Sequence, residues 1–173
     1  DAIVHEGVPY YWQKDREFEK FIDLPLRSSA EFELASNGDD DVRAMLSKHG
    51  WRHVSVDDVA QNSDDYRDYV WCSGAEFTVS RDQYVRPRTG WFSDRSACYL
   101  AAGRPVITQE TGFSKFIPTG RGLFAFSSME EILSATEAIR SDYEGNSNAA
   151  REIAAEYFAA EKVVGSLMDR AGL

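Results

Sequence analysis

The sequence predicts an α/β domain of the Rossmann-like type, in which a parallel sheet carries helices on both faces. First, strand-like segments alternate with segments of helical apolar spacing over most of the 173 residues. Second, the run Pro105–Gln109 begins with apolar residues and follows a helix that Gly103 ends, as expected for a strand buried in a parallel sheet. The chain has neither an internal repeat nor a low-complexity tract.

Residues 1–30 do not fit this alternation, and we treat them as a separate N-terminal helical or linker segment. Apolar spacing indicates a helix from Tyr10 to Ile22. Leu24 precedes a proline and therefore avoids the helical region, which ends that helix. Residues 31–173 are the predicted Rossmann-like domain.

The first half of this domain alternates strands at 31–35, 51–56 and 76–79 with two helices. One helix begins after Asp39, with an acidic first turn that suits the helix dipole, and ends at Gly50. The other begins at Ser63 and ends near Gly74.

The second half begins with a helix whose N-cap is Ser93, because a serine hydroxyl can accept from a free backbone N–H one turn ahead. Strands follow at 105–109 and 123–126, and Ser128 with Glu131 matches a capping box. We expect a turn at 145–148 and then one or two helices over 147–171, with a break near 159–161 and an end at Gly172.

Ligands of parallel sheets bind outside the carboxyl ends of the strands. The predicted strands place four loops at that edge: 36–39, 56–61, 80–95 and 109–113.

The segment 80–95 carries the strongest functional pattern, a concentration of arginines in a chain of net charge −10. Arginines beside a helix N-terminus favour a phosphate or diphosphate. The residues of this candidate site are Arg86, Arg88, Gly90, Trp91, Ser93, Asp94 and Arg95. Gly90 would let backbone approach a ligand and Trp91 could stack on a nucleobase. Alternatively, the arginines form ion pairs with surplus carboxylates such as Asp94. One of the two neighbouring aromatic residues, Trp91 or Phe92, would then fill the core.

Two further loops contribute candidate binding residues. Glu110, with Thr111 and Gly112, follows a buried strand at the ligand edge, where carboxylates hydrogen-bond sugar hydroxyls. Asn37 and Gly38 form a turn that faces a phosphate or sugar, or a plain turn before a helix N-cap.

Composition excludes several classes of function. The net charge of −10 argues against nucleic acid or anionic membrane as a partner. No apolar run is long enough to span a bilayer, and we expect a cytoplasmic protein. Cys72 and Cys98 fit no metal spacing and are expected to be buried reduced thiols. None of the three histidines has a partner that suggests catalysis.

The segment Leu100–Gly112 resembles the A-x-G-x-P-V-I-x-x-x-x-G segment in the C-terminal half of GT-B fold glycosyltransferases. The segment Gly90–Ser96 is similar to the start of the donor-site helix in one bacterial branch of them, and the resemblance extends from about Phe32 to Leu173. It implies a donor-binding half that holds a nucleotide-diphosphate sugar and needs neither metal nor cofactor. The acceptor would bind to an N-terminal half upstream, to which residues 1–30 connect.

The chain departs from the family at one place. Many retaining members carry two glutamates eight positions apart around this helix, and the corresponding residues here are Gly90 and Cys98. Catalytic residues are therefore left unassigned.

Two other functions are consistent with the sequence. One is half of a sugar-nucleotide epimerase, which uses a similar fold and diphosphate site. The other is a non-catalytic α/β interaction module. Arginines and Glu110 that face one cleft favour donor binding, whereas the same residues facing apart favour the interaction module.

Overall fold

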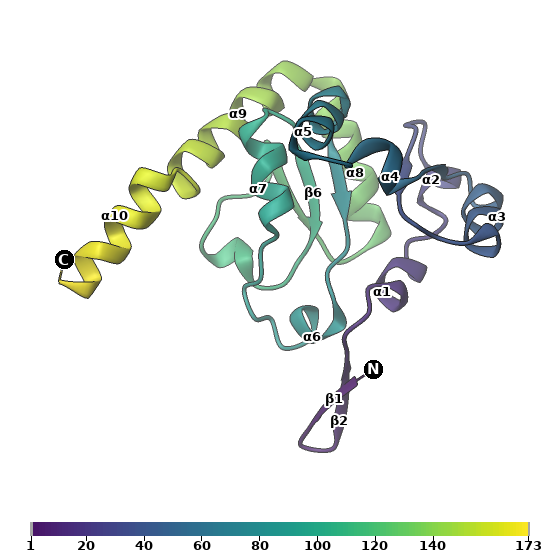
Figure 1. The fold of residues 1–173 in the computed structure, drawn as a ribbon, viewed down its shortest axis with the longest axis horizontal. Helices are drawn as coiled ribbons and strands as arrows, with labels where there is room; N and C mark the ends of the chain where they lie inside the picture. The colour runs from purple at the N-terminus through teal and green to yellow at the C-terminus, as the bar shows by residue number, and fades with distance from the viewer. Residues whose placement is uncertain (1, 173) are drawn as a thin grey trace.

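The computed structural model describes residues 2–172 and shows an α/β fold (Figure 1). Its strands are β1 (Ala2–His5), β2 (Val8–Tyr11), β3 (Glu33–Ala35), β4 (Arg52–Val54), β5 (Glu76–Thr78), β6 (Val106–Gln109) and β7 (Leu123–Phe126). Its helices are α1 (Asp15–Glu19), α2 (Leu24–Arg27), α3 (Asp40–Lys48), α4 (Val56–Val59), α5 (Ser63–Cys72), α6 (Asp82–Val85), α7 (Asp94–Ala101), the 3-10 helix η1 (Phe113–Lys115), α8 (Met129–Ser141), α9 (Tyr143–Tyr157) and α10 (Ala160–Ala171).

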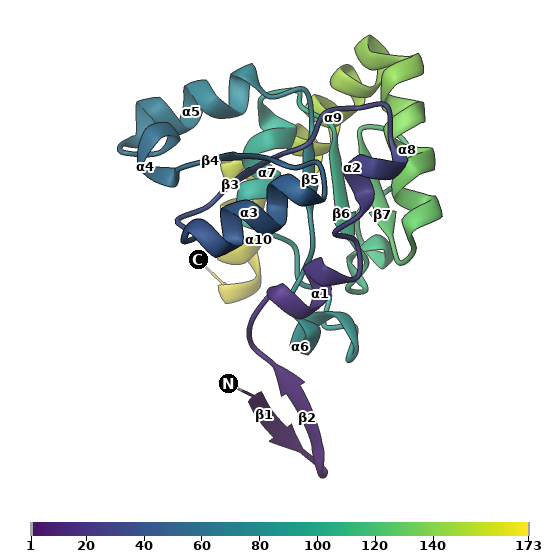
Figure 2. The same ribbon diagram turned by 90° about the vertical axis from the view of Figure 1, so that its right-hand side faces the viewer.

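The predicted parallel strands are present, but they form two sheets. Strands β5, β6 and β7 pair in that order, all parallel, and β3 pairs in parallel with β4. The β3–β4 pair lies on the β5 side of the larger sheet (Figure 2). The ring of Phe32, just before β3, meets that of Phe77 in β5 at 6.2 Å, so aromatic packing joins the two sheets.

Helices cover both faces of the larger sheet, as the sequence predicts. Along β6, Val106 belongs to one apolar cluster and Ile107 to the other, because successive side chains of a strand point to opposite faces. One cluster brings α2, α3 and α8 to the sheet, and the other brings α5, α7 and α9. Phe21 and Leu24 from residues 1–30 belong to the first cluster.

The predicted helix from Tyr10 to Ile22 is wrong at both ends. Leu24, predicted to avoid the helical region, is the first residue of α2, because a proline is tolerated in the first turn of a helix, where no backbone N–H is needed. Tyr10 and Tyr11 lie in strand β2, which forms an antiparallel hairpin with β1, and α1 spans only Asp15–Glu19. The two hairpin-loop residues, Glu6 and Gly7, both have positive φ (50° and 77°), as a type I′ turn requires. That turn folds the segment back before a helix can begin.

The predicted turn at 145–148 is also wrong, since these residues lie in the first two turns of α9. The N-cap is Asp142, whose carboxylate accepts from the N–H of Gly145 at 3.0 Å. Asn146 is buried, and its side-chain amide makes hydrogen bonds inside the fold instead of facing solvent in a turn.

Several predicted helix ends are confirmed. Asp39 accepts from the N–H of Val42 at 3.0 Å, and Ser128 forms the capping box with Glu131. Gly103 and Gly172 have positive φ (70° and 73°), and the predicted break near 159–161 lies at residues 158–159, between α9 and α10.

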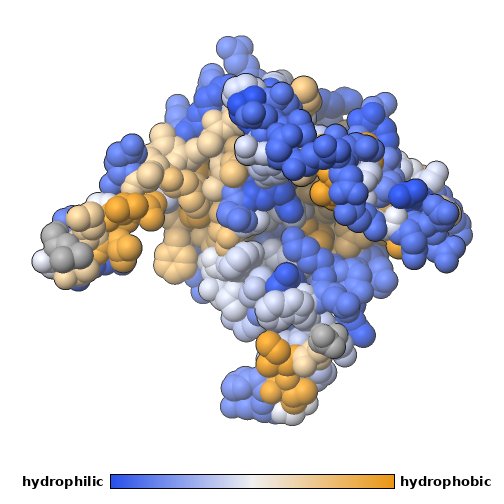
Figure 3. Space-filling view, in the orientation of Figure 1, coloured by the Kyte–Doolittle hydropathy of each residue, from blue (hydrophilic) through white to orange (hydrophobic). Residues whose placement is uncertain are grey.

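Two apolar elements project from the body of the molecule. Helix α10 contributes no buried residue, and it exposes Val163, Val164, Leu167 and Met168. The hairpin β1–β2 exposes Ile3, Val4 and Val8. Both stand out as hydrophobic against a largely hydrophilic surface (Figure 3). Among residues 2–172, no helix combines the length and the apolar character needed to cross a bilayer.

Candidate functional site

The arginine segment leaves β5 as the short helix α6 rather than as an open loop. Asp82 in its first turn is buried, and its carboxylate forms an ion pair with Arg86, with Arg86 Nη2 at 2.6 Å from Asp82 Oδ2. The hydrogen bond from Arg86 lowers the pKa of Asp82, and the N–H of Tyr11 lowers it further.

Arg86 is directed toward the N-terminal hairpin. Its guanidinium donates to the carbonyl of Pro9 and lies 4.5 Å from the centroid of the Tyr10 ring. The structure therefore does not bring Arg86 together with Glu110.

Arg88 and Glu110 do come together. Arg88 Nη2 lies 3.5 Å from Glu110 Oε1, with the arginine half-exposed and the glutamate largely buried. The same glutamate oxygen accepts from the N–H of Gly112. A Cβ on Gly112 would lie 2.8 Å from the carbonyl oxygen of Arg88, so glycine is required where the two loops touch. The two loops that follow β5 and β6 thus meet at this pair.

Two hydrogen bonds extend the contact between these loops. The N–H of Gly90 donates to the carbonyl of Thr111 at 2.7 Å, and Thr111 Oγ1 donates to the carbonyl of Trp91 at 2.5 Å. Thr111 is fully buried, so its side chain holds the loops together. Trp91 stacks on Tyr84 at 4.7 Å and stays about half exposed.

The start of α7 differs from the prediction in one respect. Ser93 is the N-cap residue, but its hydroxyl makes no capping hydrogen bond to the helix backbone. It lies 3.4 Å from Asp94 Oδ1, the oxygen that accepts from the N–H of Arg95 at 2.9 Å. The Ser93 hydroxyl is therefore held only by a long contact.

Arg95 points away from Arg88 and into the space between α7 and β5. Its Nε donates to Glu76 Oε1 at 2.6 Å, and its Nη2 donates to Thr78 Oγ1 at 2.7 Å. Glu76 and Thr78 are both buried. The sequence did not predict this ion pair, because the pattern of apolar and polar residues in β5 gave no sign that the side chain of Glu76 faces the interior.

Two half-buried tyrosines of α5 have raised pKa values. Burial raises the pKa of Tyr66 in α5 to about 12, and burial together with the hydrogen bond to Glu33 raises that of Tyr69. Tyr69 Oη donates to Glu33 Oε1 at 2.8 Å. Both hydroxyls stay protonated at neutral pH, and that of Tyr69 acts as a hydrogen-bond donor.

Asn37 and Gly38 lie apart from the arginines, at the carboxyl end of β3. Asn37 Oδ1 accepts from the N–H of Val56 at 3.2 Å and so ties the loop after β3 to helix α4. A Cβ on Gly38 would lie 2.6 Å from Val42 Cγ1, so the glycine permits close approach of α3. Both residues therefore have a structural role in this fold.

The N-terminal segment brings charged residues that the sequence prediction missed. Glu17 is buried, and its Oε2 accepts from Gln109 Nε2, at the end of β6, at 2.7 Å. Burial, together with the charges of Arg95 and Arg81 and against the opposing effect of Glu76, lowers the pKa of Lys14 to about 8. Although Lys14 as a residue is exposed, these cations lie close enough to act on its ammonium.

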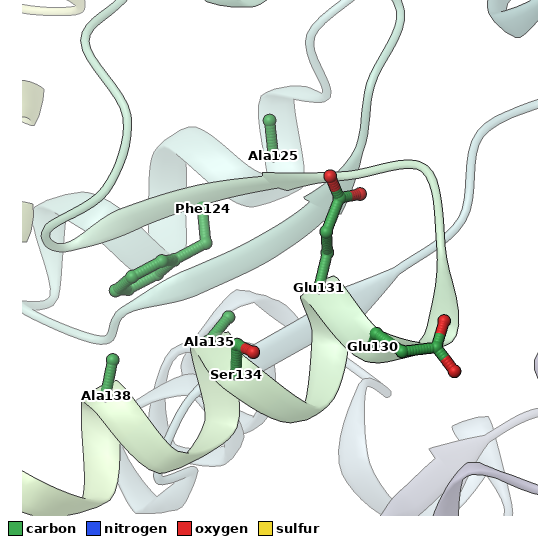
Figure 4. Close-up of a pocket in the computed structure, with 7 residues that line it drawn as sticks. All are labelled: Phe124, Ala125, Glu130, Glu131, Ser134, Ala135 and Ala138. Carbon is green, nitrogen blue, oxygen red and sulfur yellow. The ribbon is translucent and has the colours of Figure 1, made fainter.

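Two hollows of the surface lie elsewhere. One, of about 390 Å³, lies between β7 and α8 and is lined by Phe124, Ala125, Glu130, Glu131, Ser134, Ala135 and Ala138 (Figure 4). The other, of about 450 Å³, lies between α7 and α9 and is lined by Ala97, Cys98, Ala101, Arg151, Ala154, Ala155, Phe158 and Ala159. None of the predicted site residues lines either hollow.

Cys72 and Cys98 are exposed, so the expectation of buried thiols is wrong: neither is among the residues that α5 and α7 bury. Within residues 2–172, no group of three or more histidine, cysteine, aspartate or glutamate side chains is arranged to hold a metal ion.

The predicted site therefore divides into parts. Six predicted residues meet where the loops after β5 and β6 join: Arg88, Gly90, Trp91, Glu110, Thr111 and Gly112. Arg86 and Arg95 face other partners, and Asn37 and Gly38 follow β3. No protein-family model matches this chain, and no curated protein is similar enough to count as a relative.

Proposed function

We propose that this chain is the donor-binding half of a cytoplasmic GT-B-type glycosyltransferase and holds a nucleotide-diphosphate sugar. The observation that carries the proposal is the pair Arg88–Glu110, which joins the loops after β5 and β6 at the carboxyl edge of a parallel sheet. Ligands of such sheets bind at that edge. A cation and a hydrogen-bond acceptor side by side suit a ligand with both phosphates and hydroxyls.

Each member of this group has a role in the proposal. Arg88 is half-exposed, and its 3.5 Å contact with Glu110 is long enough to be exchanged for a phosphate oxygen. Glu110 would then accept from hydroxyls of the ribose or the sugar. The exposed part of the Trp91 ring offers a surface on which a base can stack.

Arg88 would also assist the chemical step. Transfer of the sugar leaves negative charge on the departing diphosphate, and the guanidinium of Arg88 would stabilise that charge. The acceptor and a catalytic base would come from an N-terminal half, so the isolated chain is expected to bind donor weakly and to turn it over little.

Calorimetric titration with UDP, GDP, dTDP and ADP tests the proposal, on this chain and on a longer protein that carries the upstream half. We expect one nucleotide to bind selectively and Arg88→Ala to weaken it at least about tenfold, the effect of losing one charge-assisted contact. Arg43→Ala is the matched control, since Arg43 is a surface arginine paired with Asp40 in α3. Absence of binding in the longer protein would overturn the proposal.

One observation favours the interaction module as a second function. Helix α10 and the hairpin β1–β2 expose large apolar side chains to solvent. The module predicts no nucleotide binding in either protein, so the same titration separates the two functions.

A further inference from the structure

Phe116 is the most exposed of the large apolar side chains among residues 2–172, with 74% of its surface accessible to solvent. A single exposed apolar residue needs no explanation by itself, since folded proteins expose much apolar surface. The place of Phe116 in the fold is what distinguishes it. It directly follows η1, in the loop that leaves the carboxyl end of β6, and this edge of a parallel sheet is where ligands bind.

The backbone around Phe116 is held in place by the core. The N–H groups of Phe116 and Ile117 both donate to the carbonyl of Phe113, at 2.9 and 3.1 Å. Phe113 and Ile117 are themselves buried in the apolar cluster that contains Val106. The exposed ring is therefore presented between two anchored residues, and a ligand that contacts it would not first have to order the loop.

Phe116 contacts the other loop of the candidate site at Gly90. A Cβ on Gly90 would lie 3.9 Å from Phe116 Cε2, which is ordinary van der Waals contact. The N–H of Gly90 donates to the carbonyl of Thr111 at 2.7 Å, in the same loop as Phe116. The loops after β5 and β6 thus touch at Gly90 as well as at Gly112.

A second exposed aromatic ring follows Gly90 directly. Trp91 stacks on Tyr84 with 4.7 Å between ring centroids and 15° between ring planes, and it is still 46% exposed. Its carbonyl accepts from Thr111 Oγ1, so its backbone is tied to the loop of Phe116. Two exposed rings therefore border one glycine, and hydrogen bonds between the two loops hold both in place.

Polar groups lie next to these rings on the same two loops. Arg88 comes two residues before Gly90, and its Nη2 lies 3.5 Å from Glu110 Oε1. The segments 88–91 and 110–116 thus carry aromatic rings, a cation and a carboxylate together. A ligand with a flat ring at one end and phosphates and hydroxyls at the other matches this set of groups.

We propose that Phe116 and Trp91 bind the nucleobase of the ligand, with Phe116 as a contact that the proposed function does not assign. Every base has a flat π-face, and aromatic side chains bind unpaired bases by stacking on it. The inference rests on the proposed function for the diphosphate that Arg88 would hold. Binding of the base is a separate matter, because a nucleoside carries a base but no phosphate.

The test is calorimetric titration with UDP, GDP, dTDP, ADP, the four corresponding nucleosides and inorganic pyrophosphate, on this chain and on a longer protein that carries the upstream half. Phe116→Ala removes the ring, and Phe116→Tyr keeps it. Leu26→Ala in α2 is the matched control, because Leu26 is an apolar residue of similar exposure, 63%.

We expect Phe116→Ala to weaken binding of the preferred nucleotide and of its nucleoside about tenfold, with Phe116→Tyr and Leu26→Ala near wild type. Pyrophosphate, which has no ring, should bind equally to all four proteins. Because the ring is exposed, its removal should leave the melting temperature unchanged, so the loss of affinity would report a contact with the ligand.

The outcomes distinguish the base site from the donor function. Nucleotide binding that weakens in Arg88→Ala but not in Phe116→Ala would keep the proposed function and reject the base site. Nucleoside binding that depends on Phe116, with diphosphates bound no more tightly than nucleosides, would keep the base site and reject the donor function.

Two further results would overturn the inference. If Phe116→Ala weakened pyrophosphate as much as nucleotide, the change would act on the phosphate contacts and not on the base. If neither nucleosides nor nucleotides bound to either protein, the base site and the donor function would both be rejected.

Discussion

Lys14 is a charged side chain that folding moves into an unfavourable environment. Its pKa falls from the usual 10.5 to about 8, so between these pH values the unfolded chain holds a proton that the folded chain has released. Folding stability contributed by this group therefore rises with pH across that window. Removing the charge of Lys14 should therefore remove a cost to folding stability that reaches its full size below pH 8.

We expect Lys14→Met to be more stable than wild type at pH 7, and the difference to shrink as the pH approaches 10.5. Urea unfolding of both proteins at several pH values measures this difference. Tyr66 and Tyr69, whose raised pKa values lower stability at high pH, are present in both proteins and cancel. A difference that grows with pH would contradict the assignment.

Gly112 holds the two loops of the candidate site at contact distance. Its φ is 98°, and an added Cβ would lie 2.8 Å from the Arg88 carbonyl oxygen. We expect Gly112→Ala to cost about 3 kcal/mol of unfolding free energy, from backbone strain and the clash together. Chemical denaturation measures it.

Gly120 is the matched control for that change, because its φ is 104° but no atom lies within 4 Å of the added Cβ. Gly120→Ala should lose only the cost of backbone strain, about 1 kcal/mol. An equal loss in both variants would mean that the loops do not touch at Gly112.

Among the elements, α9 is held by a residue that looks like a turn former. Asn146 Oδ1 accepts from the N–H of Gly122 at 2.9 Å, and its Nδ2 donates to the carbonyls of Ala138 and Asp142. One buried amide thus joins the loop before β7, the end of α8 and the start of α9. Since removal of the amide leaves these buried groups unpaired, its contribution exceeds that of an ordinary hydrogen bond.

We expect Asn146→Ala to lower the free energy of unfolding by about 2–3 kcal/mol. The control is Asn148→Ala, which changes an exposed residue of the same helix and should stay within about 0.5 kcal/mol. Equal effects in thermal or chemical denaturation would show that the bridge through Asn146 does not stabilise the fold.

The sequence predicts elements well where a local cause sets their ends. The cap at Asp39, the capping box at Ser128 and the positive φ at Gly103 are local, and each is confirmed. The predictions for Tyr10–Ile22 and 145–148 were wrong because contacts with distant residues determine the structure of these segments. The hairpin depends on pairing of Tyr10 with Ile3, and Asn146 depends on Gly122, 24 residues away.

The candidate site follows the same division. Glu110 directly follows β6 and Arg88 lies in the segment that follows β5, two strands that the sequence locates, so their meeting could be expected. The direction of each arginine side chain could not be predicted. Arg86 binds Pro9 and Arg95 binds Glu76, and both contacts join segments that are distant in the sequence. Lys14 was missed for the same reason, since only the folded chain brings it near Arg95.

For the whole molecule, α10 adds little to the stability of the body. It buries none of its residues, whereas α9 buries Ala150, Ile153 and Ala154. We expect a chain that ends at Ala159 to keep its free energy of unfolding within about 1 kcal/mol of the full chain. Thermal and chemical unfolding of both proteins measures the difference.

A chain that ends at Ala149 provides the comparison, because it also loses the three buried apolar residues of α9. It should fail to fold cooperatively, as expected when several core side chains are removed together. A large loss of stability in the first truncation would mean that α10 packs on the body in solution.

The stacked rings of Phe92 and Phe158 connect the loop before α7 mechanically to the base of α10. Phe92 lies between Trp91 and Ser93, and its ring stacks on that of Phe158 at 5.1 Å, one residue before the joint at Ala159. Beyond the joint, the twelve residues of α10 form a rigid arm of about 18 Å, so a rotation of about 10° at the joint would swing its tip by about 3 Å. A small shift of the loop beside Arg88 would thus be amplified into a displacement at the far end of the molecule.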